Sequence, residues 1–263
     1  MLDNDREKYE SFYKNFGLQL KYGAYSDYGE RKDLLKDLLL FYSSTEKKLV
    51  SLKEYRERMK EDQEFIFYAC GDTVEHLDRL PQAEAVKDKG YEILYFTEDV
   101  DEFVTKVMPV YKEKEFRSIS SDDLGLESEE EKEETKKQQE ENKDLFSAIK
   151  EALGDRITEV RLSGRLKNAA CCLTAKGPIS LEMERVLGTM PGEQKVKAER
   201  VLELNPDHEI FPILQKLYPD DKETLADYAE LLYGQALIRE GILPEDPAAF
   251  AAVLCRLMER KEK

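Results

Sequence analysis

The sequence predicts an α/β lobe followed by an α+β lobe. Between residues 64 and 120, short apolar runs alternate with helical stretches, which is typical of a small parallel sheet with crossover helices. A dense acidic run then interrupts the chain, and the part that follows begins with strand-like segments and ends in a helical bundle. A length of 263 residues is enough for two domains.

Helices open the first lobe. Residues 3–42 read as two helices around the Gly- and Tyr-rich segment "KYGAYSDYGE", and the second of them has an apolar face. That face is formed by Leu34, Leu35, Leu38, Leu39 and Phe41. Ser51 begins a further helix in "SLKEYRERMKED", because Glu54 follows three residues later and completes a capping box. We expect this helix to end before the apolar run "FIFYACG".

Three apolar runs supply the predicted sheet of the first lobe. These runs are "EFIFYACG", "YEILYFT" and "EFRSIS". The segments between them, "DTVEHLDRLPQAEAVKDKG" and "DVDEFVTKVMPVYKEK", read as helices. Short apolar runs bounded by helices suit buried parallel strands, so we expect this lobe to be α/β.

The acidic run marks the domain boundary. Residues 122–146 contain few apolar residues and many glutamates, which is typical of a solvated helix or a connector. We therefore expect residues 1–121 to form the first domain, residues 122–146 an acidic helical connector and residues 147–263 the second domain.

The second domain is predicted to be α+β. Its strand-like segments are "ITEVRLS", "NAACCLTA" and "ERVLELN", with a short helix before the last of them. From His208 onwards the chain reads as helical, in "HEIFPILQKLYP", "ETLADYAELLYGQALIREG" and "DPAAFAAVLCRLMERK". If Cys171 and Cys172 lie on a strand, their side chains point to opposite faces.

Composition limits the partners and the compartment. A net charge of −16 disfavours phosphate backbones and anionic lipid, so we expect neither a nucleic-acid nor a membrane partner. No signal-like segment opens the chain and no apolar run approaches the length of a membrane span, so we expect a cytoplasmic protein. The cysteines form no C-x-x-C pair, and we expect reduced core thiols.

Motifs for catalysis and metal binding are missing from the sequence. His76 and His208 have no cysteine or carboxylate at metal-ligand spacing, so we expect structural or exposed histidines and no metal site. No P-loop, G-x-S-x-G or H-E-x-x-H pattern occurs, and no catalytic residue is assigned. Gly71 and Asp72 follow a predicted strand, which leaves a nucleotide-binding enzyme as an alternative, although Asp72 is also explained as a helix N-cap.

The last two predicted helices carry more apolar surface than one packing partner covers. Leu225, Ala229, Leu232 and Ala236 form one stripe, and Tyr228, Leu231 and Ile238 form a second. The last helix starts with Asp246 as N-cap and Pro247, and its face is formed by Phe250, Val253, Leu254, Leu257 and Met258. A two-fold related copy would complete a four-helix bundle. Its interface would contain Leu232, Ala236, Phe250, Val253, Leu254 and Leu257. The alternative is that both helices fold back on their own domain.

A methionine-rich stripe marks residues 179–192. It consists of Ile179, Met183, Val186, Leu187 and Met190. Chain breakers on both sides, "KGP" and "PG", predict a short helix on flexible loops. Methionine suits a surface that accepts many partners, because its side chain is flexible and polarizable. Packing of this helix in a core is the alternative.

Several segments together resemble the bacterial branch of the 90-kilodalton heat-shock protein family of molecular chaperones. They are "EKYESFYKNFG", "LLLFYSS", "SLKEYRERMKEDQEFIFY", "DEFVTKVMPVYKEKEFRSIS", "LGDRITEVRLSGRL" and "ELNPDHEI". The resemblance runs over essentially the whole chain. It implies that this chain corresponds to the late part of the middle domain followed by the C-terminal dimerisation domain. The ending "MERKEK" differs from the acidic terminal motif with which eukaryotic cytosolic members recruit cochaperones.

The resemblance also implies what the chain does. We expect a homodimer that binds unfolded or partly folded client proteins in the stress response, and no enzyme activity in this chain. The ATP-binding motifs and the catalytic arginine of the family would lie upstream of Asp3, so ATP and magnesium belong to the full-length proteins. Client contacts are expected from exposed Met183, Val186, Leu187 and Met190, and from Phe103, for which a core role is the alternative. A purely structural dimerisation module remains a further alternative.

Overall fold

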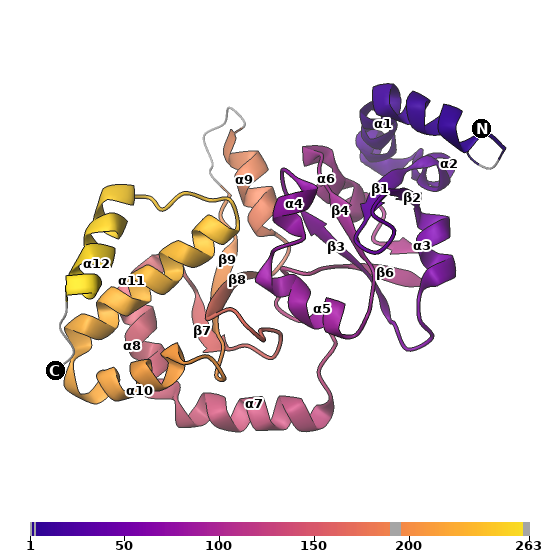
Figure 1. Ribbon diagram of the computed structural model, residues 1–263. Coiled ribbons are helices and arrows are strands. Elements are labelled where there is room, and N and C mark those ends of the chain that lie inside the picture. The colour runs from indigo at the N-terminus through magenta and orange to yellow at the C-terminus, as the bar shows by residue number, and fades with distance from the viewer. Residues whose placement is uncertain (1, 3, 190–195, 260–263) are drawn as a thin grey trace. The chain divides into compact units, whose positions relative to one another are not determined.

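A computed structural model describes residues 2, 4–189 and 196–259, and these residues form helices and two mixed sheets (Figure 1). Contacts divide the chain into two units. Unit 1 contains residues 1–79 and 86–119, and unit 2 contains residues 80–85 and 120–263. The predicted combination of helices and sheets in an α/β architecture is therefore confirmed at this level.

Unit 1 is built on a six-stranded sheet in the order β2-β1-β4-β3-β6-β5. The central strands β4 (Ile93–Phe96), β3 (Phe65–Cys70) and β6 (Lys114–Ser118) pair in parallel, as the apolar runs predict. The short strand β5 (Val110–Tyr111) joins the edge antiparallel to β6. The prediction that residues 99–114 are helical throughout is wrong after α6 (Asp99–Val107), because Pro109 cannot continue the helical hydrogen bonding.

An antiparallel hairpin at the other edge corrects the prediction of helix up to residue 42. Strand β1 (Leu40–Ser43) pairs with β2 (Leu49–Ser51) and with β4. Leu39 and Phe41 are fully buried among sheet residues, whereas Leu34 is 78% exposed. The apolar residues 34–41 therefore do not share one helix face: they divide between α2 (Lys32–Leu35), η1 (Lys36–Leu38) and the strand.

Helices cover the sheet of unit 1. Helix α1 (Arg6–Gly29) contacts α6, and α3 (Leu52–Arg58) follows β2. The capping box is confirmed: Ser51 Oγ accepts from Glu54 N, and Glu54 Oε2 accepts from Ser51 N at 2.6 Å. After β3 come α4 (Val74–Leu77), η2 (Pro81–Ala83) and α5 (Glu84–Asp88), so the predicted single crossover helix is broken at Pro81. Asp72 is not the N-cap, because Thr73 Oγ1 accepts from His76 N instead.

Unit 2 contains a three-stranded sheet in the order β7-β9-β8. Its strands are β7 (Glu159–Leu162), β8 (Cys171–Lys176) and β9 (Glu199–Leu204). Its helices are α7 (Glu129–Glu141), α8 (Lys143–Leu153), η3 (Gly154–Arg156), α9 (Leu181–Thr189), α10 (Ile210–Asp220), α11 (Lys222–Arg239) and α12 (Pro247–Glu259). Helix α7 buries none of its side chains, as expected for the acidic segment.

The core of unit 2 lies between its sheet and α8, α10 and α11. Cys171 belongs to this core, whereas Cys172 packs with Leu166 and Ala169 on the other side of the strand. The prediction that the two cysteines face opposite sides of a strand is therefore confirmed. None of the four cysteines, all of which the structure describes, forms a disulfide; Cys171 and Cys172 are buried, whereas Cys70 is half-buried and Cys255 exposed. In the part of the chain that the structure describes, no helix is long and apolar enough to cross a membrane.

Candidate functional site

Helix α9 carries the predicted methionine-rich stripe, and it is anchored to unit 2. Ser180 Oγ accepts a hydrogen bond from Met183 N at 3.0 Å, which starts the helix. Glu184 holds Arg200 on β9 at 2.9 Å and accepts from Ala198 N at 3.0 Å. Leu181 enters the core of the unit. These contacts fix the described part of the helix on unit 2.

The side chains of that stripe are less accessible than expected. Met183 is 9% exposed and Val186 3%, so the prediction that these two lie open to solvent is wrong. Leu187 is half-buried and keeps some accessible surface. Met190 lies outside the described residues. A four-residue spacing places a stripe on one face of a helix, but the sequence pattern does not reveal whether that face meets protein or water.

Phe103 lies on α6 and is half-buried. Its ring meets that of Tyr25 on α1, with the centroids 5.6 Å apart and the planes inclined at 56°. Its neighbour Val104 is buried in the core of unit 1. Phe103 therefore belongs to the rim of unit 1, with part of its ring accessible.

Helix α11 turns one predicted interface stripe inward. Leu232 is 3% exposed and Ala236 1%, and both belong to the core of unit 2. The carbonyl of Leu232 accepts a hydrogen bond from Cys171 Sγ at 3.2 Å. The prediction that these two residues form a dimer interface is wrong, because α8 and β8 of the same unit already cover this face. A stripe read from sequence cannot distinguish a partner in the same chain from one in another.

Helix α12 buries little of its apolar surface within unit 2. Asp246 Oδ1 accepts from Ala249 N at 2.9 Å, so the predicted N-cap before Pro247 is confirmed. The ring of Phe250 lies so close to Gly234 of α11 that a methyl group there would collide with it. Val253, 8% exposed, is the one buried side chain recorded for α12. The two helices therefore do pack on each other, through a narrow contact.

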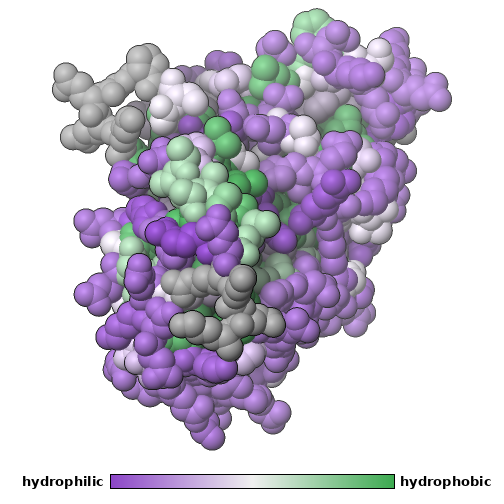
Figure 2. Space-filling model, turned by 60° about the vertical axis from the view of Figure 1, so that its left-hand side comes forward, coloured by the Kyte–Doolittle hydropathy of each residue, from purple (hydrophilic) through white to green (hydrophobic). Residues whose placement is uncertain are grey.

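The outer side of α12 is apolar. Leu254 is 38% exposed and Met258 76%, and Leu257 is half-buried. Exposed Ala248, Ala249, Ala251 and Ala252 extend this surface. Figure 2 shows the resulting pale and dark green area amid a mainly hydrophilic surface. We call these exposed residues of α12 the α12 apolar face. Large exposed apolar areas on soluble proteins commonly mark interaction sites.

A groove of about 440 Å³ runs between α11 and α12. Polar pairs line it: Arg256 Nε lies 3.0 Å from Asp227 Oδ2, and Arg156 Nη1 donates to Glu230 Oε2 at 2.8 Å. Arg156 also lies over the ring of Tyr233, 5.3 Å from its centroid. The part of the groove's lining around Phe250 is apolar.

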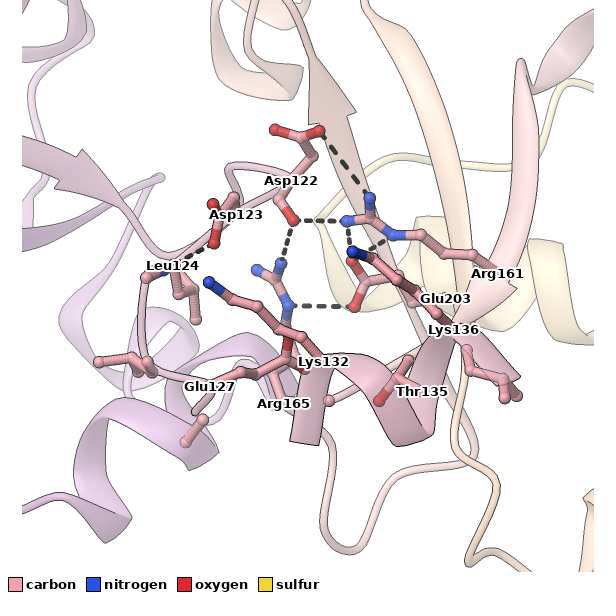
Figure 3. A pocket seen from close by; sticks show the side chains of 15 residues that line it. Asp122, Asp123, Leu124, Glu127, Lys132, Thr135, Lys136, Arg161, Arg165 and Glu203 are labelled. Carbon is pink, nitrogen blue, oxygen red and sulfur yellow. Dashed lines mark hydrogen bonds and ion pairs between the residues drawn. The ribbon is translucent and has the colours of Figure 1, made fainter. Parts of the chain in front are cut away.

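A second cavity, of about 270 Å³, lies beside β7 and β9 (Figure 3). At its base Glu203 is 1% exposed and receives two arginines: Arg161 Nη2 at 2.6 Å and Arg165 Nε at 3.0 Å. Ser163 Oγ donates to the same carboxylate at 2.8 Å. Burial alone would raise the pKa of Glu203, but the two guanidinium groups hold this pKa below its ordinary value.

The two arginines of this cavity also bind the backbone of the segment at Ser121 and Asp122. Arg165 Nη2 donates to the carbonyl of Asp122 at 2.8 Å and its Nη1 donates to the carbonyl of Ser121, while Arg161 Nη2 reaches the same Asp122 carbonyl at 2.5 Å. The charged residues of the wall are Asp122, Asp123, Glu127, Glu203, Lys132, Lys136, Arg161 and Arg165. Because acids and bases are equal in number and the guanidinium groups are engaged, this cavity is built to fix residues 121–127 rather than to attract a charged ligand.

The turn after β3 offers little to a nucleotide. The helix that follows, α4, has four residues, so few of its amides are free to bind phosphate. His208 Nδ1 accepts a hydrogen bond from Ile210 N at 3.1 Å, so this imidazole caps the start of α10. Among residues 2, 4–189 and 196–259, no three His, Cys, Asp or Glu side chains are arranged to hold a metal ion.

The described residues thus form two units of mixed α/β architecture, and helix α12 of the second unit carries exposed apolar side chains. Comparison with known proteins identifies the family. The family profile for Hsp90 protein matches residues 1–263, and the chain belongs to the Hsp90 family. The resemblance predicted from the sequence segments is therefore confirmed.

The relatives are bacterial chaperones. Chaperone protein HtpG of Clostridium perfringens is 57% identical over 259 residues, which covers 98% of this chain and 41% of that protein. The HtpG of Bacillus subtilis is 54% identical over 258 residues, with the same shares of both chains. The HtpG of Clostridium acetobutylicum is 55% identical over 259 residues, again 98% of this chain and 41% of the relative. The chain thus spans about two fifths of the length of the curated relatives that it matches.

Proposed function

We propose that this chain is a chaperone segment that dimerises through α12 and holds partly folded proteins, without chemistry of its own. The observation that carries the proposal is the α12 apolar face, with Leu254 and Met258 open to solvent in a chain of the Hsp90 family. ATP and magnesium would act in other parts of the full-length proteins. Specific and non-covalent binding of clients is then the work of this segment.

Dimerisation follows from the unequal burial of α12. Its inner side uses Val253 and Phe250 to contact α11, and its outer side has Leu254 and alanines without a partner in unit 2. A second copy related by a two-fold axis would place the same face opposite itself, which is the self-complementary contact of symmetric dimers. Small alanine side chains allow two helices to approach closely, so α11 and α12 of both copies would form a four-helix bundle.

Client binding would use accessible apolar side chains, among them Leu187 and Phe103. Full burial of one such side chain is worth about 1.5 to 3 kcal/mol. A few such contacts, less the cost of ordering the client, give affinities on the order of micromolar. Binding of this strength suits capture and release.

The experiment is the suppression of aggregation of guanidinium-denatured citrate synthase, followed by light scattering. We expect the wild-type chain to reduce scattering at stoichiometric ratios, and the double variant Leu187→Ser, Phe103→Ser to reduce it less. A matched control is Val110→Ser, Ile213→Ser, which removes apolar side chains that are 46% and 42% exposed elsewhere. No suppression of aggregation by the wild-type chain would refute client binding. An equal loss of suppression in both variants would refute the role of Leu187 and Phe103 as client contacts.

The nucleotide-binding alternative has a direct test in equilibrium dialysis with ATP. We expect no saturable binding to this chain. Saturable micromolar binding that Asp72→Ala weakens would instead favour the enzyme alternative.

A further inference from the structure

Helix α7 is attached to the sheet of unit 2 without apolar contacts of its own. Residues 127–144 contain no apolar side chain, and α7 buries none of its side chains. Most helices in proteins are held in place by an apolar face, and an isolated helix of this length is only marginally stable in water. The attachment of α7 to unit 2 is therefore polar.

Gln139 attaches the last turns of α7 to the strand β7. Its Oε1 accepts a hydrogen bond from Leu162 N at 2.8 Å, and its Nε2 donates to the carbonyl of Val160 at 3.2 Å. Strand β7 stands first in the sheet order β7-β9-β8, so no further strand of the described chain pairs with its outer side. The side-chain amide of Gln139 therefore takes the place that the peptide group of a neighbouring strand would occupy.

Glu127 fixes the chain just before α7. Its carboxylate lies in the space that a side chain at position 164 would fill, and residue 164 is a glycine. Ser128 then caps the helix, because its Oγ accepts from Glu131 N at 3.2 Å. Gly164 follows β7 directly in the chain, so both ends of α7 are fixed on the same short stretch, residues 160–164.

A cavity lies between these two attachments. Lys132, Thr135 and Lys136 line the cavity of about 270 Å³ from the side of α7 (Figure 3). Side chains that border a cavity lack partner atoms across it and so gain little from dispersion. A segment with few buried apolar contacts opens at a lower free energy than the rest of its fold.

We propose that residues 128–141 form a strap that opens as one unit while the sheet of unit 2 stays folded, and that Gln139 holds this strap closed. In the open state the Val160 carbonyl and the Leu162 amide meet water, and the cavity beside Arg161 opens to solvent. The strap thus controls access to the edge of β7. The proposal concerns a motion within unit 2 and depends neither on client binding nor on dimerisation.

Hydrogen exchange resolved by residue tests this opening in the wild-type chain, without any substitution. Leu162 N donates to Gln139, whereas its neighbour Ser163 N donates to the carbonyl of Leu204 on β9 at 2.8 Å. We expect the Leu162 amide to be at least about a hundredfold less protected than the Ser163 amide, because only the latter requires the sheet to separate. Urea below the unfolding transition should change the exchange rate of Leu162 little, since the opening exposes little apolar surface.

Three variants identify the residues that hold the strap. Gln139→Ala removes both hydrogen bonds to β7 and should speed exchange at Leu162 at least about tenfold, while the Ser163 rate stays unchanged. The matched control Gln138→Ala makes the same change one position earlier on α7 and should alter neither rate. Gly164→Ala should also speed exchange at Leu162, by a smaller factor, because the new methyl group displaces Glu127.

Each result has a defined reading. Equal protection of Leu162 and Ser163 in the wild-type chain would overturn the strap, because α7 would then open only together with the sheet. An unchanged Leu162 rate in Gln139→Ala, or an equal acceleration in Gln138→Ala, would overturn the role of Gln139. Acceleration in Gln139→Ala without any in Gly164→Ala would overturn opening as one unit.

Discussion

Reversing the polarity of the α12 apolar face should separate two folded copies of the chain. The double variant Leu254→Glu, Met258→Glu changes side chains that are 38% and 76% exposed in the single chain. Complete burial of Leu or Met is worth about 1.5 to 3 kcal/mol, so covering these exposed fractions contributes about 2 to 3 kcal/mol per protomer. A symmetric dimer uses each residue twice, and the loss is then about 3 to 7 kcal/mol.

This free energy corresponds to a rise of at least about a hundredfold in the dimer dissociation constant. Sedimentation equilibrium across a dilution series measures it directly. Thermal unfolding followed by circular dichroism should remain within about 0.5 kcal/mol of wild type when both proteins are monomeric, because the substitutions lie on the surface. The matched control Ile213→Glu, Val110→Glu introduces the same charges at side chains that are 42% and 46% exposed and should leave the dimer intact.

An unchanged dissociation constant in Leu254→Glu, Met258→Glu would refute α12 as the dimer contact. A wild-type chain that stays monomeric at every concentration would also refute dimerisation through α12. Loss of the circular dichroism signal in the variant would mean that α12 contributes to the core of unit 2 more than its exposure indicates.

Three further predictions concern unit 2. Leu232→Ala should lower the free energy of unfolding by about 2 to 5 kcal/mol in chemical denaturation, because this side chain is buried in the core; a change confined to dimer dissociation would contradict that placement. The pKa of Glu203 is lowered, so its ion pairs stabilise the fold above the ordinary carboxyl pKa and lose this effect as pH falls through the lowered pKa. Glu203→Gln should therefore be less stable than wild type at neutral pH, and its free energy of unfolding, measured by urea titration, should depend less on pH in acid. Burial raises the pKa of Glu240, which accepts a hydrogen bond from Gln82 Nε2, to about 7. The free energy of unfolding should therefore fall as pH rises from 5 to 8 in wild type but not in Glu240→Gln. Parallel pH profiles for the two proteins would contradict this prediction.

Local signals in the sequence predicted local structure well. The capping box of Ser51 and Glu54 and the cap at Asp246 before Pro247 are confirmed, because both depend on side chains within three residues of the backbone that they satisfy. The strand β1 was missed because its conformation is set by pairing with β4, about fifty residues further along the chain. Apolar residues around Phe41 fit a helix face and a strand equally well at that length.

Side-chain exposure was predicted less well than secondary structure. Met183 and Leu232 were assigned to partner surfaces from their spacing, yet both are buried. Spacing defines which residues share a face, and only the folded chain decides what covers that face. The exposure of Phe16 in this chain was missed for the converse reason: apolar residues on both sides of α1 give no clear polar side, so nothing in the pattern distinguished Phe16 from core residues such as Tyr13.

The α12 apolar face suits one fixed partner better than many varied ones. It is largely alanine, with Leu254 between small side chains, and such a surface is smooth enough for close contact with one complementary helix. Protruding amphipathic rings tolerate many sequences, whereas a smooth helix face requires one fixed geometry. We therefore expect substitutions on α12 to change the oligomeric state of the chain.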